Sequence, residues 1–255
     1  MSLPPCAVSS EPQLTEQIFL STKPILARER LIFPLDVPTN EDAIGLVDTL
    51  ADAVHFYKVG LELLLGGRYV DLVDVLVDRG KQIMLDAKLF DVPATVQAAV
   101  RQASRCKVTF CTVHVNDAML QAAAQAKGGM KILSVTVLTS LDENDLRDLG
   151  FETDVTSLVL SRAKRALALG CDGVVSSGLE ASELRSKLGE KFLIVTPGIR
   201  PVANVDDQKR TVDVEQAFLN GADYIVVGRP IRDAADPKRA AEDIQRRIAK
   251  VFAGR

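Results

Sequence analysis

The sequence has no tryptophan, only three tyrosines and two histidines, and no long uninterrupted apolar run. A membrane-spanning helix needs about 20 consecutive apolar residues, so this absence argues against a membrane protein. The formal net charge is −3 and the pI is near 5.5, whereas nucleic-acid-binding domains usually carry clustered Lys and Arg and a basic pI. We therefore expect neither a membrane nor a nucleic acid as partner.

The four cysteines show no metal-type spacing. They are Cys6, Cys106, Cys111 and Cys171. Cys106 and Cys111 lie five apart, but no pair of His or Cys residues follows to complete a zinc site. We expect no metal and a reduced, cytoplasmic protein with inert thiols.

Residues 1–28 are rich in Pro, Ser, Gln and Thr. They lack the basic start and apolar core of a secretory signal, so we expect a poorly ordered N-terminal leader without catalytic content. The remaining residues, 29–255, are enough for one α/β barrel, which takes roughly 250 residues, although two small domains would also fit.

After the leader, short runs rich in Val, Ile and Leu alternate with segments of helical apolar spacing. The eight predicted strands are 31–36, 54–59, 82–86, 108–114, 132–138, 173–176, 192–196 and 224–228. The predicted helices are 41–51, 68–79, 94–105, 118–127, 155–169, 180–188, 214–220 and 237–252. Continuous apolar strands joined by helices indicate a parallel sheet with right-handed crossovers. Eight such units predict a single (β/α)8 barrel.

A doubly wound open sheet is the alternative fold. Its dinucleotide-binding form needs a glycine-rich turn after the first strand, but that turn here reads LDVPTNEDA (35–43) and has no glycine. The longest interruptions, near 139–153 and 200–212, have the size of active-site loops. We therefore expect one domain with no internal boundary.

The stretch QIMLDAKLFDVPATV (82–96) places charges at the end of a predicted buried strand. Asp86 and Lys88 are two residues apart and so point to the same face. Asp36 and Lys58 end the two preceding strands, and chemistry in such barrels sits at the C-terminal strand ends. These charges form either a satisfied ion-pair network or a preorganised electrostatic site in which a lysine delivers a proton. We favour the site, because buried charge without a task stabilises a barrel poorly.

The ends of the last two strands predict a site for a phosphate group. GADYIVVGRPI (221–231) ends a strand with Gly228 and Arg229, and VTPGIRP (195–201) adds Arg200. Either segment alone reads as an ordinary turn with an exposed arginine. Phosphate sites of these barrels, however, are frequently built from the loops after strands seven and eight, and arginine grips phosphate bidentately. Together the two segments suggest a phosphorylated substrate.

The strand-end motifs resemble those of the orotidine 5′-phosphate decarboxylase family, in particular its bacterial branch. The central motif is Asp-x-Lys-x-x-Asp within LDAKLFDVPATV (85–96). The others are LDVPT (35–39), KVGLEL (58–63), SVTVLTSLDENDL (134–146), VTPGIRP (195–201), DQKR (207–210) and GADYIVVGRPI (221–231). The resemblance covers nearly the whole barrel. It implies decarboxylation of orotidine 5′-monophosphate (OMP) to UMP, with no metal or cofactor.

The resemblance also implies a role for each matching residue. Lys88 would protonate C6 of the pyrimidine while Asp86 lies against the departing carboxylate, and Asp91 with Thr95 would reach across a homodimer interface into the partner's site. The expected substrate-binding residues are Asp36 and Lys58 for the ribose, Thr139 and Pro197 for the pyrimidine, and Arg200, Gln208, Gly228 and Arg229 for the phosphate. Lys58 would also contact the neighbouring aspartate and so belong to the catalytic charge array.

Two positions depart from the family pattern. Phe90 stands where members commonly have histidine, and Ala94 where they commonly have asparagine. Both flank the catalytic residues without being the groups that do chemistry, so we expect activity to survive. His55 and His114 are expected to be structural.

Two other functions remain open. A sugar-phosphate decarboxylase or synthase of the same superfamily shares Asp-x-Lys-x-x-Asp and generally uses magnesium; Glu62 is an available carboxylate, but DQKR and VTVLTS (135–140) favour the nucleotide enzyme. The other alternative is a catalytically dead phosphate-ligand binder, for which loss of Asp86 or Lys88 would be the sign. Both residues are present.

Overall fold

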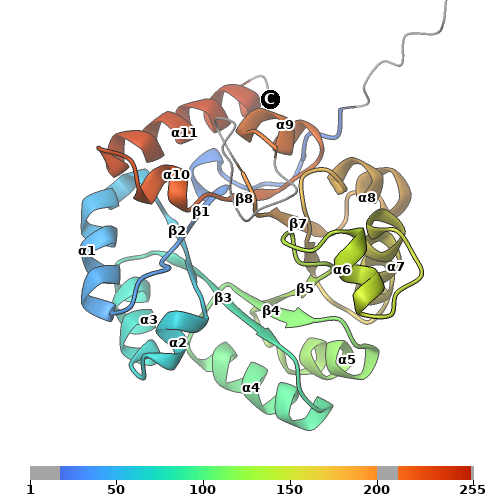
Figure 1. The fold of residues 1–255 in the computed structure, drawn as a ribbon. Coiled ribbons are helices and arrows are strands. Elements are labelled where there is room, and N and C mark those ends of the chain that lie inside the picture. Colours follow the sequence, from blue (N-terminus) through green and yellow to red (C-terminus); the bar gives the residue numbers. More distant parts are fainter. Residues whose placement is uncertain (1–17, 200–211, 254–255) are drawn as a thin grey trace, which may run out of the picture.

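A computed structural model describes residues 18–199 and 212–253 of the chain. Within these residues, eight parallel strands close into a barrel in the order of the sequence, and helices surround them (Figure 1). The strands are β1 (Leu31–Pro34), β2 (Phe56–Val59), β3 (Gln82–Leu89), β4 (Phe110–His114), β5 (Lys131–Val135), β6 (Gly173–Val175), β7 (Leu193–Thr196) and β8 (Tyr224–Val226). The predicted single (β/α)8 barrel is confirmed.

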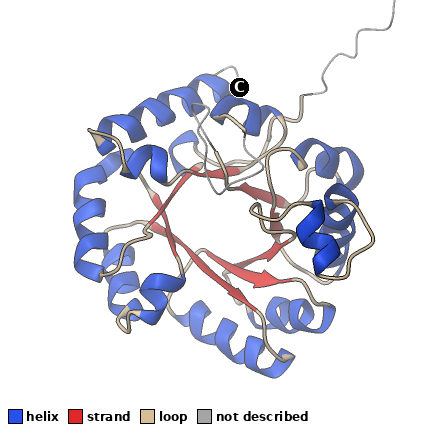
Figure 2. Ribbon diagram, in the orientation of Figure 1, coloured by secondary structure: helices blue, strands red, loops and turns tan. Residues whose placement is uncertain are grey.

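The helices form an outer ring around the strands (Figure 2). They are α1 (Asn40–Leu50), α2 (Leu61–Leu65), α3 (Tyr69–Asp78), α4 (Pro93–Arg105), α5 (Asp117–Ala126), α6 (Glu143–Asp148), α7 (Val155–Ala168), α8 (Ala181–Leu188), α9 (Val214–Leu219), α10 (Arg229–Arg232) and α11 (Pro237–Phe252), with 3-10 turns η1 (Ala27–Glu29) and η2 (Ala51–Ala53). The eight predicted helices are present within one residue at each end. The helices α2, α6 and α10, which are five, six and four residues long, lie in segments that were not among the predicted helices.

Side-chain caps explain where several helices begin. The side chain of Thr39 accepts the Asp42 N–H before α1, and Asp154 accepts the Ser157 N–H before α7. These bonds satisfy N–H groups that have no partner inside the helix. The caps therefore fix the residues at which the loops after the strands end and these helices begin.

Layers of inward-facing side chains fill the barrel interior. In the lower layer the rings of Phe56, Phe110 and Tyr224 pack against one another at centroid distances of 5.0–5.7 Å. Because strand side chains alternate, the next inward positions lie two residues further, at Lys58 on β2 and Thr112 on β4. An apolar floor thus supports a polar layer at the C-terminal ends of the strands.

Residues 18–28, within the predicted leader, contact the opposite end of the barrel. The Phe19 N–H donates to the carbonyl of Leu219. Ser21 Oγ and Lys23 Nζ lie 2.5 and 3.1 Å from Oδ1 of Asp223, which is fully buried. Residues 1–17 lie outside the described residues, so a poorly ordered leader stays a prediction for them.

Asp223 is the centre of a buried ion cluster. Nη2 of Arg185 lies 2.7 Å from its Oδ2, and both side chains are almost completely buried. The Ile194 N–H donates to the same oxygen, and Nη1 of Arg30 donates to the Asp223 carbonyl. The cluster joins the segment before β1 to β7, α8 and β8.

None of the helices in the described ranges combines the length and apolar character needed to span a bilayer.

We predict that Arg185→Met lowers the free energy of unfolding by about 3–5 kcal/mol, because it leaves a buried carboxylate without its partner. The matched control is Arg165→Met, whose exposed ion pair with Asp117 should contribute little to stability, because solvent screens it. Urea unfolding of both variants measures the difference. Equal, small losses would contradict a structural role for the cluster.

Candidate active site

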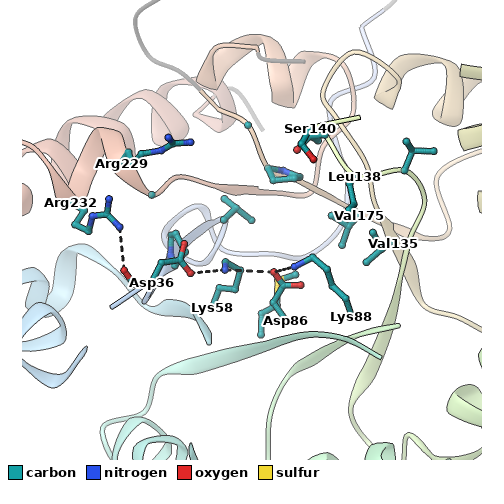
Figure 3. Close-up of a pocket in the computed structure, with 18 residues that line it drawn as sticks. Asp36, Lys58, Asp86, Lys88, Val135, Leu138, Ser140, Val175, Arg229 and Arg232 are labelled. Carbon is teal, nitrogen blue, oxygen red and sulfur yellow. Dashed lines mark hydrogen bonds and ion pairs between the residues drawn. The ribbon is translucent and has the colours of Figure 1, made fainter. Parts of the chain in front are cut away.

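A cavity of about 520 Å³ opens at the C-terminal ends of the strands. Its walls come from β1, β2, β3, β5, β6 and β8 and from the loops that follow the strands (Figure 3). The structure brings together eight of the residues singled out from the sequence: Asp36, Lys58, Asp86, Lys88, Thr139, Pro197, Gly228 and Arg229. Its volume lies within the range of about 300–1,000 Å³ that is typical of ligand pockets.

Four charged side chains alternate in sign along one wall of the cavity. Lys58 Nζ lies 3.0 Å from Asp36 Oδ1 and 3.6 Å from Asp86 Oδ2. Lys88 Nζ lies 2.8 Å from the same Asp86 oxygen. The array runs Asp36–Lys58–Asp86–Lys88 (Figure 3), and it joins β1, β2 and β3 in the order of the barrel.

Asp86 is ionised although it is buried. Burial alone raises the pKa of a carboxyl group, but the charges of Lys58 and Lys88, with hydrogen bonds from Lys88 and Thr112, bring the pKa of Asp86 below its ordinary value. The two lysines therefore stabilise the carboxylate form. The result is a fixed negative charge with a positive charge on either side.

The backbone at Lys88 departs from regular strand geometry. Lys88 has φ +46°, a left-handed conformation that costs a non-glycine residue on the order of 1–3 kcal/mol. The pairing register between β3 and β4 shifts between Leu85 and Leu89, and such bulges re-aim side chains next to active sites. The strand was predicted to end at residue 86, whereas β3 continues to Leu89 through this irregularity.

The ends of β8 and β1 approach each other closely at the edge of the cavity beside Asp36. A Cβ atom at position 228 would lie 2.8 Å from Cγ of Pro34, so only glycine fits at Gly228 without displacing its neighbour. Arg229 is the first residue of α10 and lines the cavity. This side combines a close backbone approach with a guanidinium group, as an oxyanion site requires.

Asp91 and Thr95 do not line the cavity of their own chain, as the described residues define it. Both are exposed, and the Asp91 carboxylate accepts a hydrogen bond from the Val92 N–H. Arg200 and Gln208 lie outside the described residues, so the structure gives no position for them.

The sequence interpretation missed two polar residues next to this array. Arg232 on α10 lines the cavity, and its Nη1 donates to the Asp36 carbonyl at 3.2 Å. Thr112 on β4 is within hydrogen-bond distance of Asp86 Oδ1. A signal for Thr112 existed, since it lies two residues before the strand-end His114. Arg232 follows Arg229 by three and gave no separate signal.

His114 packs against Phe90, with ring centroids 5.7 Å apart and planes nearly perpendicular. Burial, followed by the charges of Arg162 and Lys88, lowers the pKa of His114. Its ring is therefore neutral at physiological pH. Nδ1 accepts a hydrogen bond from the Val115 N–H, so the imidazole is held by its own loop.

No group of three or more His, Cys, Asp or Glu side chains suited to a metal ion occurs in the part of the chain that the structure describes. The donor set around the cavity instead consists of two carboxylates interleaved with lysines. Each carboxylate already faces an ammonium group at ion-pair distance. A cation at either carboxylate would therefore have to compete with a lysine.

The chain is similar to a known protein family and to named proteins from several bacteria. The model of the "Orotidine 5'-phosphate decarboxylase / HUMPS family" matches residues 29–244. Orotidine 5'-phosphate decarboxylase of Methylococcus capsulatus is 60% identical over 237 residues, which cover 92% of this chain and 98% of the relative. The protein of the same name from Xanthomonas axonopodis pv. citri is 52% identical over 88% of this chain and 94% of its own length.

A solved structure agrees with these sequence matches. The crystal structure of orotidine 5'-phosphate decarboxylase from Lactobacillus acidophilus superposes with a TM-score of 0.77 at 35% identity, covering 86% of this chain and 99% of that one. Family model, curated relatives and fold agree over almost the whole barrel. The chain belongs to the orotidine 5'-phosphate decarboxylase / HUMPS family.

Proposed function

We propose that this chain is a carbon–carbon lyase that decarboxylates OMP to UMP and carbon dioxide in pyrimidine biosynthesis, without a metal or organic cofactor. The observation that carries the proposal is the alternating array Asp36–Lys58–Asp86–Lys88 in one cavity wall. The names of relatives at 52–60% identity support the choice of OMP over a sugar phosphate.

The chemical problem is a pair of electrons left on C6 of the pyrimidine when the carbon–carbon bond breaks. In our proposal the substrate carboxylate lies against Asp86, whose fixed negative charge either disfavours the bound carboxylate or positions it for departure. As carbon dioxide leaves, the ammonium group of Lys88 gives its proton to C6 and becomes an amine, which regains a proton from water. Fixed charges that favour the transition state over the ground state accelerate a reaction.

The rest of the nucleotide would extend from the array toward β8. Asp36 and Lys58 would hold the ribose hydroxyls, while Thr139 and Pro197 would line the pyrimidine. Gly228 and Arg229, with Arg200 and Gln208, would bind the phosphate. Binding energy from this remote phosphate can be used at the reacting carbon, which is why a phosphate site belongs to the proposal.

We also propose that the enzyme is a homodimer in which Asp91 and Thr95 complete the partner's site. Residues 90–95 are all exposed and include the apolar Phe90, Val92, Pro93 and Ala94. Phe90 is 70% and Val92 62% exposed. Apolar side chains around an exposed carboxylate that does not enter its own cavity suit an interface between two copies. Residues 29–255 would be the catalytic domain.

We predict that purified, EDTA-treated protein converts OMP to UMP, measured by the change in absorbance, and that Lys88→Ala lowers the rate by at least about 100-fold, the lower range for a lost general acid. The matched control is Lys127→Ala. Lys127 makes an equally short ion pair, 2.8 Å to Asp172, with similar exposure, but it lies at the other end of the barrel.

The outcomes separate the alternatives. Turnover that requires restored magnesium would favour a sugar-phosphate enzyme, to be tested with sugar phosphates as substrates. Binding of UMP without turnover of OMP would identify a phosphate-ligand binder. A Lys88→Ala variant as active as Lys127→Ala would contradict the proposed role of Lys88.

We predict complementation between Asp91→Ala and Lys88→Ala chains. In a mixed dimer one site combines Lys88 of the Asp91→Ala chain with Asp91 of the Lys88→Ala chain, while the other site lacks both residues. A symmetric two-fold dimer should therefore recover about half of the wild-type activity. The mixed dimer is isolated with two different affinity tags, and each variant alone serves as control. An inactive, verified mixed dimer would refute a shared site.

A further inference from the structure

Thr112 occupies the inward-facing layer of the barrel next to Asp86. It lies in the middle of β4 (Phe110–His114), two residues beyond the aromatic floor residue Phe110, and it is fully buried. A buried hydroxyl group needs hydrogen-bond partners. Its hydrogen-bond partners belong to β3, the strand that carries the Asp86 and Lys88 charges proposed to act on the substrate.

The Thr112 hydroxyl group joins a side chain and a backbone group. The Lys88 N–H donates to Thr112 Oγ1 at 2.9 Å, and Oγ1 lies 2.9 Å from Asp86 Oδ1 and 3.5 Å from the Leu85 carbonyl. An ionised carboxylate only accepts hydrogen bonds, whereas a hydroxyl group both donates and accepts. Thr112 therefore donates to Asp86 and accepts from Lys88.

This arrangement ties the irregular part of β3 to β4. The register of β3 against β4 shifts between Leu85 and Leu89, and Lys88 has a positive φ within the shifted segment. Its N–H bonds to the Thr112 side chain on β4. The hydroxyl group thus holds a backbone conformation that a lysine rarely adopts.

The two oxygens of Asp86 have different partners. Oδ1 is bonded to Thr112, whereas Oδ2 faces both Lys88 Nζ at 2.8 Å and Lys58 Nζ at 3.6 Å. The bond to Thr112 therefore sets the rotation of the carboxylate. Without it, the carboxylate could turn and change its position relative to both ammonium groups.

We propose that Thr112 is a positioning residue that fixes the Asp86 carboxylate and the Lys88 backbone relative to each other. This inference rests on the proposed decarboxylase function. It assigns to Thr112 no contact with the substrate, since the residue is not part of the cavity lining. Its effect falls on the chemical step, through the geometry of two other side chains.

The test compares Thr112→Val with Thr112→Ser. Valine keeps the shape but removes the hydroxyl group, so kcat should fall about tenfold, equivalent to about 1.4 kcal/mol, while KM changes by less than about twofold. Serine keeps the hydroxyl group and should retain kcat within about threefold of wild type. If the valine variant does not fold, Thr112→Ala against Thr112→Ser makes the same comparison.

Thr136→Val is the matched control. Thr136 is also fully buried, and its Oγ1 donates to the Val175 carbonyl, so the substitution removes a buried hydroxyl group that contacts neither Asp86 nor Lys88. Its kcat should remain at the wild-type level. A valine variant at position 112 with wild-type kcat, or equal losses in the valine and serine variants, would overturn the proposal.

Crystal structures of the valine and serine variants add a readout that does not depend on turnover. The expected result is that Lys88 φ and the Lys88 Nζ–Asp86 Oδ2 separation stay as in the wild type with serine and change with valine. Unchanged geometry in the valine variant would refute the inference. If the wild-type enzyme does not convert OMP, the decarboxylase proposal fails separately, and this comparison still decides the role of Thr112.

Discussion

The upper half of the barrel depends on the carboxylate of Asp86, which is buried between two ammonium groups. A buried carboxylate without partners takes up a proton or destabilises the fold by several kcal/mol in round terms. Lys58 and Lys88 keep Asp86 ionised by lowering its pKa. Both β2 and β3 must therefore place a lysine next to this carboxylate. The constraint extends to the neighbouring strands, because Lys58 also pairs with Asp36 on the β1 side and Thr112 holds Asp86 from β4.

A second buried carboxylate, Asp223, is likewise held by charged and hydrogen-bonding partners, but none of its own surface is exposed. Its oxygens are occupied by Ser21, Lys23, Arg185 and the Ile194 N–H, and it has no exposed surface. The Asp86 cluster instead borders a cavity, where the Lys88 side chain is 33% exposed. One cluster is closed by protein groups, and the other leaves charge available to a ligand. This difference separates a stabilising end of the barrel from a functional one, as is usual for the fold.

Periodicity in the sequence predicted the eight strands, eight of the helices and the strand-end charges, because each depends on local apolar spacing and on chain order. It could not predict the bulge, since a positive φ at Lys88 arises from contacts with β4 rather than from the identity of residue 88. The spacing of Thr112 from the strand-end His114 could have placed its side chain on the inner face, but not its hydrogen bonds to residues 24 and 26 positions away. The partner of Arg232 lies 196 residues away. Local patterns carry no information about such pairs.

The phenylalanine at position 90 has a physical consequence for the proposed dimer. A histidine at this position would titrate near neutral pH, whereas Phe90 adds apolar area and no charge. Its ring packs edge-on against His114, and burial together with the charges of Arg162 and Lys88 lowers the pKa of that histidine. A dimer formed through residues 90–95 would then be stabilised by apolar burial around the Asp91 carboxylate, and its strength would not depend on protonation of a histidine at position 90.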